Sequence, residues 1–159
     1  MITLRFVTSD NPLSALIRTQ AGICMPFTPS HVEALTRDGT GYIGERFPDG
    51  MQIKPIGYDE NEPGVEEKLV ELPVSDKMSG AFFDFCENRI GEPYDWKSIG
   101  SFAAPDINLH EINHLICSAM MTAALRDCGF FPMPLTVPFH HISPRDLFLI
   151  LSSHVQINH

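Results

Sequence analysis

Hydrophobic and polar residues alternate along the first half of the chain in the manner of β-strands. Ile2, Leu4 and Phe6 fall on every second position of the first run, so their side chains share one face of a strand. Pro12 follows at a position that favours a helix start, and a short helix over residues 13–19 is expected. Asp38-Gly39 is a strong hairpin signal between the next two strands. The later strands are expected over residues 29–36, 42–47, 51–56 and 68–74.

The second half of the chain changes to a helical spacing. Ser75-Asp76 is suited to cap a helix whose apolar residues recur every three to four positions. A longer apolar pattern over residues 116–125 predicts a second helix, and Ser143-Pro144 predicts the start of a last one. Strands followed by helices predict an α+β fold, in which a small antiparallel sheet packs against a central helix that begins at or near Cys117. At 159 residues, the chain is expected to form one domain over residues 1–159.

Composition and charge narrow the classes of partner. The chain has 11 Lys and Arg residues against 20 Asp and Glu residues, a formal net charge of -9, and this balance disfavours nucleic acid as a ligand. The first residues lack the features of a secretory signal, and no apolar run reaches the ~18 to 20 residues needed to span a bilayer. We therefore expect a soluble cytoplasmic protein. Its four cysteines form no C-x-x-C pair and are expected to be reduced.

Cys117 is the main candidate for chemistry. It opens the longest apolar helical pattern in the chain, and a thiol in the first turn of a helix faces unpaired backbone N–H groups and the positive end of the helix dipole. These groups stabilise a thiolate, which is the nucleophilic form of cysteine. Cys86 falls on the apolar face of its own helix and is interpreted as core, while Cys24 and Cys128 lack a comparable setting.

A thiol nucleophile needs an imidazole to transfer the proton and a polar group to orient that imidazole. The predicted hairpin supplies His31 on its first strand and Glu45 on its return strand. If opposing residues have numbers that sum to an even value, His31 and Glu45 lie on the same face, directly or diagonally across from each other. A register shifted by one residue would place Glu45 on the other face and remove it from this role.

A family resemblance is carried by five segments in a fixed order, Ser30-His31-Val32, Glu45, Gly91-Glu92-Pro93-Tyr94-Asp95, Ile116-Cys117-Ser118 and Ser143-Pro144-Arg145-Asp146-Leu147. Together they resemble the circularly permuted NlpC-like cysteine hydrolases, which are papain-fold proteins whose histidine strand precedes the cysteine helix. This group includes the lecithin:retinol acyltransferase-like enzymes. The resemblance extends over residues 28–148.

The resemblance implies a role for each matched residue. Cys117 would be the nucleophile, His31 the general base, Glu45 the residue that orients the imidazole, and Tyr94 a neighbour of the nucleophile that helps to shape the oxyanion site. The implied reaction is hydrolysis of an amide or ester through an acyl-thioester, with a cell-wall peptide or a lipid-like acyl compound as substrate. No metal and no cofactor are expected.

A zinc site is the competing interpretation. His110-Glu111-Ile112-Asn113-His114 matches the H-E-x-x-H pattern, in which two histidines bind zinc and the glutamate acts as general base. On a continuous helix, His110, His114 and Cys117 would share one stripe. A third protein ligand would have to come from a distance, from His140, His141 or Asp127.

A non-catalytic binding module on the same fold is the third interpretation, because a fold does not guarantee activity. The presence of a cysteine, a histidine and a carboxylate in the expected order favours the enzyme.

Overall fold

The computed structural model describes residues 1–21, 26–46, 48–93, 117–131 and 142–154. Five strands and four helices lie in these ranges, and they confirm the predicted α+β class. In chain order the elements are β1 (Ile2–Thr8), α1 (Pro12–Ala21), β2 (His31–Leu35), β3 (Gly41–Arg46), β4 (Gly50–Pro55), β5 (Glu66–Leu72), α2 (Asp76–Glu87), α4 (Cys117–Asp127) and α5 (Pro144–His154).

The strands form one antiparallel sheet in the order β4-β3-β2-β1-β5. β2 and β3 are joined by the predicted hairpin turn, where Gly39 has a φ of 70°, a left-handed conformation that glycine adopts without steric cost. β5 begins at Glu66, two residues before the predicted strand, because Glu66 and Glu67 pair with Thr8 and Val7 of β1.

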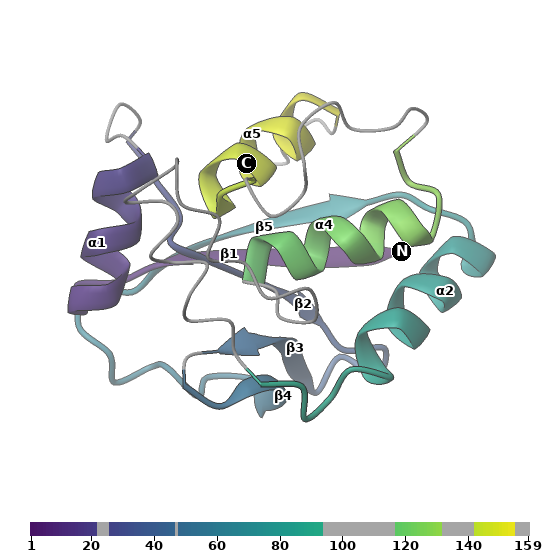
Figure 1. The fold of residues 1–159 in the computed structure, drawn as a ribbon, viewed down its shortest axis with the longest axis horizontal. Coiled ribbons are helices and arrows are strands. Elements are labelled where there is room, and N and C mark those ends of the chain that lie inside the picture. Colours follow the sequence, from purple (N-terminus) through teal and green to yellow (C-terminus); the bar gives the residue numbers. More distant parts are fainter. Residues whose placement is uncertain (22–25, 47, 94–116, 132–141, 155–159) are drawn as a thin grey trace.

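One face of the sheet is apolar and is covered by helices. Leu4, Phe6, Val32, Ala34 and Ile43 lie on this face by their pairing register, and they belong to one buried cluster with residues of α2, α4 and α5. Helix α4 packs on β2 and β3, and Figure 1 shows α2 and α5 on either side of it. Burial of these side chains supplies the main driving force for folding.

The other face of the sheet is polar yet also buried. Arg5 of β1 is only 4% exposed, and its guanidinium donates hydrogen bonds to Glu33 at 2.8 Å, to Asp59 at 3.1 Å and to Glu67. Its guanidinium carbon also lies 4.7 Å from the centre of the Tyr42 ring. Charged groups are costly to bury unless they are paired and hydrogen-bonded, so this network accounts for the polar side chains in the interior of the sheet.

The capped helix α2 is placed as its sequence predicts. Ser75 adopts an extended N-cap conformation, and its hydroxyl accepts a hydrogen bond from the backbone N–H of Met78 at 3.3 Å. Phe82 and Cys86 face inward and are fully buried. The interpretation of Cys86 as a core residue is therefore confirmed.

Gly44 of β3 gives Glu33 room in the sheet. A Cβ atom built at Gly44 would lie 2.8 Å from Cβ of Glu33, which is too close for an undisturbed structure. We expect Gly44→Ala to lower the free energy of unfolding in urea by about 1 to 3 kcal/mol. Gly80→Ala is the matched control, because a Cβ there meets nothing within 4 Å and alanine is favoured in a helix. Equal stability of the two variants would contradict this account.

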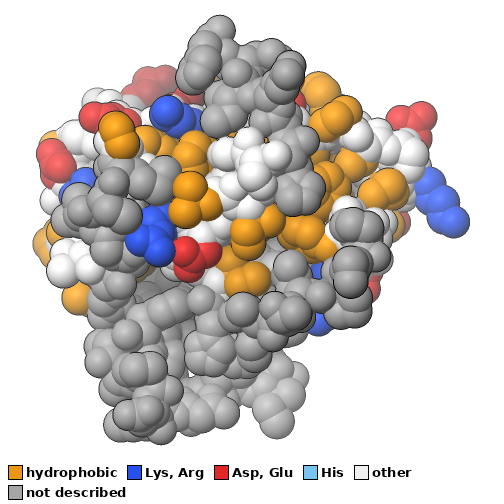
Figure 2. Space-filling model, turned by 90° about the horizontal axis from the view of Figure 1, so that it is seen from above, with side chains coloured by type: hydrophobic (Ala, Val, Ile, Leu, Met, Phe, Trp, Pro, Cys, Tyr) orange, Lys and Arg blue, Asp and Glu red, His pale blue; other side chains and the backbone are white. Residues whose placement is uncertain are grey.

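The exterior of the molecule shows apolar side chains around α5. Figure 2 views the molecule from the side on which α5 lies, and hydrophobic side chains gather across the middle of this face with charged side chains around them. Leu149 of α5 is 43% exposed. Among the described helices, none has the length and apolar character needed to cross a membrane.

Candidate functional site

Cys117 is the first residue of α4, as the sequence predicts. Its side chain is only 3% exposed, but it lines a cavity of about 150 Å³ together with His31. The other described lining residues come from β1, the start of α1, the end of β3 and the loop before β5. The thiol therefore faces a cavity rather than packed side chains alone.

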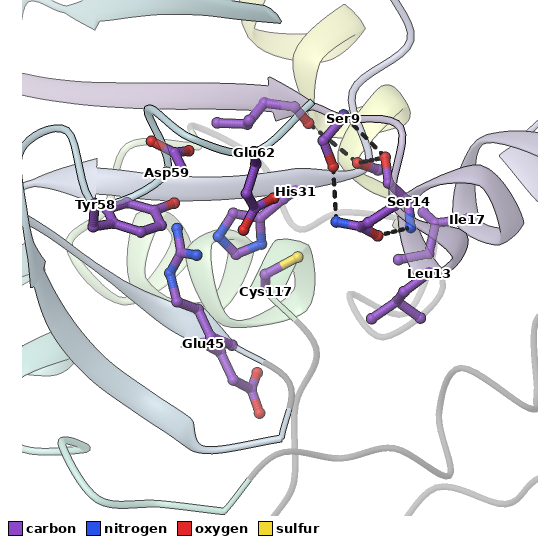
Figure 3. Close-up of a pocket in the computed structure, with 14 residues that line it drawn as sticks. Ser9, Leu13, Ser14, Ile17, His31, Glu45, Tyr58, Asp59, Glu62 and Cys117 are labelled. Carbon is purple, nitrogen blue, oxygen red and sulfur yellow. Dashed lines mark hydrogen bonds between the residues drawn. The ribbon is translucent and has the colours of Figure 1, made fainter. Parts of the chain in front are cut away.

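The imidazole of His31 lies beside the Cys117 sulfur. His31 is the first residue of β2, and Figure 3 shows one nitrogen of its ring turned toward the sulfur. The two groups interact electrostatically, and each shifts the pKa of the other. Nε2 is the ring atom nearest Glu33, so Nδ1 is left to share a proton with Sγ. The strand and the helix, which are far apart in sequence, thus bring the predicted base to the predicted nucleophile.

Electrostatics favour the charged forms of both groups. Burial of the His31 ring works against protonation, but the charge of Cys117 and the close approach of Cys117 and Glu33 to the ring raise the pKa of His31 to about 9. Burial of the thiol likewise works against ionisation, but the charge and hydrogen bond of His31 outweigh it and lower the pKa of Cys117. Backbone N–H groups of Val32 and Ser118 add to this lowering. A thiolate beside an imidazolium is the reactive state of cysteine hydrolases.

The pKa values of two other described cysteines are shifted in the opposite direction. Burial raises the pKa of Cys86 to about 12. Burial also raises the pKa of Cys128, whose Sγ donates to the carbonyl oxygen of Leu125 at 3.2 Å. Cys86, Cys117 and Cys128 are all free thiols, so Cys117 alone among these three is set up for nucleophilic chemistry.

The register of the β2–β3 hairpin differs from the even-sum register that we considered from the sequence. Ala34 pairs with Ile43 and Leu35 with Tyr42, so the numbers of opposing residues sum to an odd value. Continued along the hairpin, this register places Glu45 across from Val32 and not on the face of His31. Glu45 is buried and lines the cavity, but its carboxylate is turned away from the imidazole in Figure 3.

Glu33 is the carboxylate that contacts the imidazole. Its Oε2 lies 3.4 Å from Nε2 of His31, and the side chain is fully buried. Burial disfavours its charged form, but hydrogen bonding and the charge of His31, together with the charge of Arg46, lower the pKa of Glu33 to about 2. The structure therefore favours Glu33 over Glu45 as the residue that orients His31.

A sequence signal for Glu33 was present in the spacing. Glu33 follows His31 by two positions in one strand, and residues two apart on a strand share a face. The hairpin argument looked only across to the neighbouring strand and missed this carboxylate.

The start of α1 forms an ordered wall of the cavity. The Asn11 side chain accepts a hydrogen bond from the backbone N–H of Ser14 at 2.7 Å, as an N-cap does. The Ser14 hydroxyl shares a hydrogen bond of 2.6 Å with the hydroxyl of Ser30, the residue before His31. Leu13 and Ile17 present the apolar part of this wall. The start of β2, where His31 lies, is thus fixed by contacts with α1.

Several sequence-predicted residues lie outside the described ranges. They are Tyr94, the zinc-type residues His110, Glu111 and His114, the distant histidines His140 and His141, and Cys24. Asp127, the remaining distant ligand candidate, is the last residue of α4, and Cys117 is the first. Within the described ranges, no group of three or more His, Cys, Asp or Glu residues is arranged to hold a metal ion.

The site thus contains the Cys117 thiol and the His31 imidazole, the buried Glu33 carboxylate beside the imidazole, and a cavity wall with both polar and apolar side chains.

In comparisons with known proteins, no family model and no curated protein matches this chain.

Proposed function

We propose that this protein is a cysteine hydrolase that cleaves an amide or ester bond, with Cys117 as nucleophile and His31 as general acid and base. The observation that supports the proposal is that the Cys117 thiol and the His31 imidazole face each other in one cavity, with the pKa of the thiol lowered and the pKa of the imidazole raised. The order of histidine strand and cysteine helix is also that of the permuted papain-like fold, which we propose for the domain.

The first half of the reaction forms an acyl-enzyme. The thiolate sulfur of Cys117 attacks the carbonyl carbon, and the electron pair of the C=O bond moves to oxygen. As the tetrahedral intermediate collapses, the bond to the leaving nitrogen or oxygen breaks and Nδ1–H of His31 protonates that atom. The amine or alcohol leaves, and Cys117 holds the acyl group as a thioester beside a neutral His31.

The second half releases the acid. Neutral His31 accepts a proton from a water molecule, whose oxygen attacks the thioester carbon. Collapse of this second intermediate breaks the C–S bond and restores the thiolate beside the imidazolium. Glu33 keeps its negative charge throughout, because its contact with Nε2 stabilises the imidazolium without taking its proton.

In this proposal, the N-terminus of α4 stabilises the oxyanion. The backbone N–H of Cys117 lies in the first turn of an eleven-residue helix, where such groups have no partner within the helix. A preorganised donor of this kind is typically worth about two to three orders of magnitude in rate. Tyr94 is a second donor in this proposal, on the strength of the family resemblance alone.

Covalent labelling tests the proposal. A thiol-directed acyl probe should label the wild-type protein at Cys117, with labelling still fast at about pH 6, where an ordinary thiol is almost fully protonated. Cys117→Ala should abolish this labelling. Intact-protein and peptide mass spectrometry would measure the extent and the position of the adduct.

Cys86→Ala and Cys128→Ala are the matched controls, because both thiols are buried and have raised pKa values. Neither change should reduce labelling at about pH 6. Labelling that survives the loss of Cys117 would overturn the proposal. Hydrolysis that persists in Cys117→Ala and is lost with a chelator would instead favour zinc chemistry at His110, Glu111 and His114.

A further inference from the structure

Two cations share one oxygen of Glu33. Oε2 lies 3.4 Å from Nε2 of His31 and 2.5 Å from Nη2 of Arg46. The other oxygen, Oε1, accepts hydrogen bonds from Arg5 at 2.8 Å and from the Tyr58 hydroxyl at 3.2 Å. The Tyr58 hydroxyl also lies 3.4 Å from Oε2, but Arg46 is the cation that competes with the imidazole for this atom.

The two arginines at Glu33 are balanced differently. Arg5 also pairs with Asp59 and Glu67, so its positive charge is offset by three carboxylates. Within the described part of the chain, Glu33 is the one carboxylate in ion-pair contact with Arg46. Arg46 thus weakens the electrostatic attraction between Glu33 and the His31 imidazolium more than Arg5 does. The reason is that the other carboxylate partners of Arg5 already neutralise its charge.

Arg46 is held rigidly in this position. Its guanidinium carbon lies 3.8 Å from the centre of the Tyr58 ring, a stacking distance for a cation and an aromatic face. The side chain is 18% exposed and lines the cavity with Cys117 and His31. By the hairpin register, Arg46 also occupies the position across from His31.

Other charges face His31 from each neighbouring element. The titratable and charged groups that line the cavity or contact Glu33 are Cys117 of α4, Glu33 of β2, Arg5 of β1, Glu45 and Arg46 of β3, and Tyr58, Asp59 and Glu62 of the loop before β5. The thiolate and Glu33 favour the imidazolium, and among the cations only Arg46 shares the Glu33 oxygen that faces the ring.

We propose that Arg46 is a positioning residue of this site, which orients the Glu33 carboxylate and limits the negative charge that this carboxylate offers to His31. The inference rests on the proposed function of Cys117 and His31. It adds that Arg46 influences the pH at which this pair changes its protonation state. Without the Arg46 charge, Glu33 would hold the imidazolium more strongly, and the proton would stay on His31 to higher pH. This direction agrees with the effect of the Arg46 charge, which lowers the pKa of His31.

Titration of His31 in Arg46→Gln tests the inference. Two-dimensional NMR of the imidazole C–H groups would follow the ring directly, and the rate of Cys117 alkylation against pH would follow its partner. We expect the His31 titration in Arg46→Gln to move to higher pH by about 0.5 to 1 unit relative to wild type. Arg46→Lys keeps the charge and should titrate within about 0.3 unit of wild type.

Arg37→Gln is the control for loss of a positive charge elsewhere. Arg37 forms ion pairs with Asp84 and Glu87 on the surface, so its removal should leave the His31 titration unchanged. An unchanged titration in folded Arg46→Gln, or an equal shift in Arg46→Lys, would overturn the positioning role. These readouts need no substrate, so a protein that shows the expected shift but hydrolyses no amide or ester would count against the proposed function alone.

Discussion

Replacing His31 with Ala is expected to lower kcat/KM for the proposed amide or ester hydrolysis by about three to four orders of magnitude, because in our proposal His31 protonates the leaving atom and activates water. The same change should slow alkylation of Cys117 at about pH 6 by roughly a hundredfold or more. Burial of the thiol opposes its ionisation, and the charge and hydrogen bond of His31 are what overcome this effect in the native protein. A panel of cell-wall peptides and acyl amides or esters would supply the substrate, and mass spectrometry would follow the alkylation.

His31→Gln is the informative companion to this variant. Glutamine keeps a hydrogen-bonding side chain near Glu33 but does not shuttle a proton at neutral pH. It should therefore be nearly as inactive as His31→Ala while retaining more of the native stability. Hydrolysis within about tenfold of wild type in either folded variant would be incompatible with general acid–base catalysis by His31.

Replacing Glu33 with Ala is expected to lower the free energy of unfolding by about 3 to 5 kcal/mol, because it leaves buried positive charge without its partner. The carboxylate is fully buried and bonds Arg5, Arg46 and the Tyr58 hydroxyl. Urea denaturation followed by circular dichroism would measure the loss. Glu87→Ala removes a carboxylate from an exposed pair with Arg37 and should cost less than about 1 kcal/mol. A similarly small cost for Glu33→Ala would contradict the buried network described here.

The pH dependence of stability gives this prediction a second readout. The pKa of Glu33 is lowered from 4.5 to about 2 in the folded protein. Its contribution to stability is therefore fully present above the unfolded value and is lost as the pH falls through the folded value. Wild type should lose stability steeply between about pH 4.5 and pH 2, and Glu33→Gln should show a shallower decline over this window. Parallel profiles would mean that another carboxylate dominates acid unfolding.

The sequence predicted the position of a strand or helix well where a local pattern of residues determines that element. The alternation of Ile2, Leu4 and Phe6 predicted β1, the Ser75 cap predicted α2, and the apolar run after Cys117 predicted α4. Each of these signals depends on residues within a few positions of one another. The start of β5 was missed because pairing with β1, rather than local composition, recruits Glu66 and Glu67 to the sheet.

Long-range pairing also decided which site residues could be predicted. Cys117 was singled out because it opens a helical pattern and His31 because it lies on the first strand of the predicted hairpin, and the structure brings the two together. The register of the hairpin could not be read from the turn residues, and a shift of one residue exchanges Glu45 for Arg46 across from His31. The role of Arg5 was hidden as well, because its three carboxylate partners come from β2, β5 and the loop between β4 and β5.

The Arg5 cluster also ties the wall of the cavity to the centre of the sheet. One guanidinium on β1 holds the loop through Asp59 and the neighbouring strands through Glu33 and Glu67. Because one guanidinium makes all of these contacts, local opening of this wall also breaks contacts within the sheet. Opening the wall therefore costs more free energy than moving an unattached loop would. The cavity is consequently preorganised on this side, so little of the binding energy of a substrate is spent on ordering the loop.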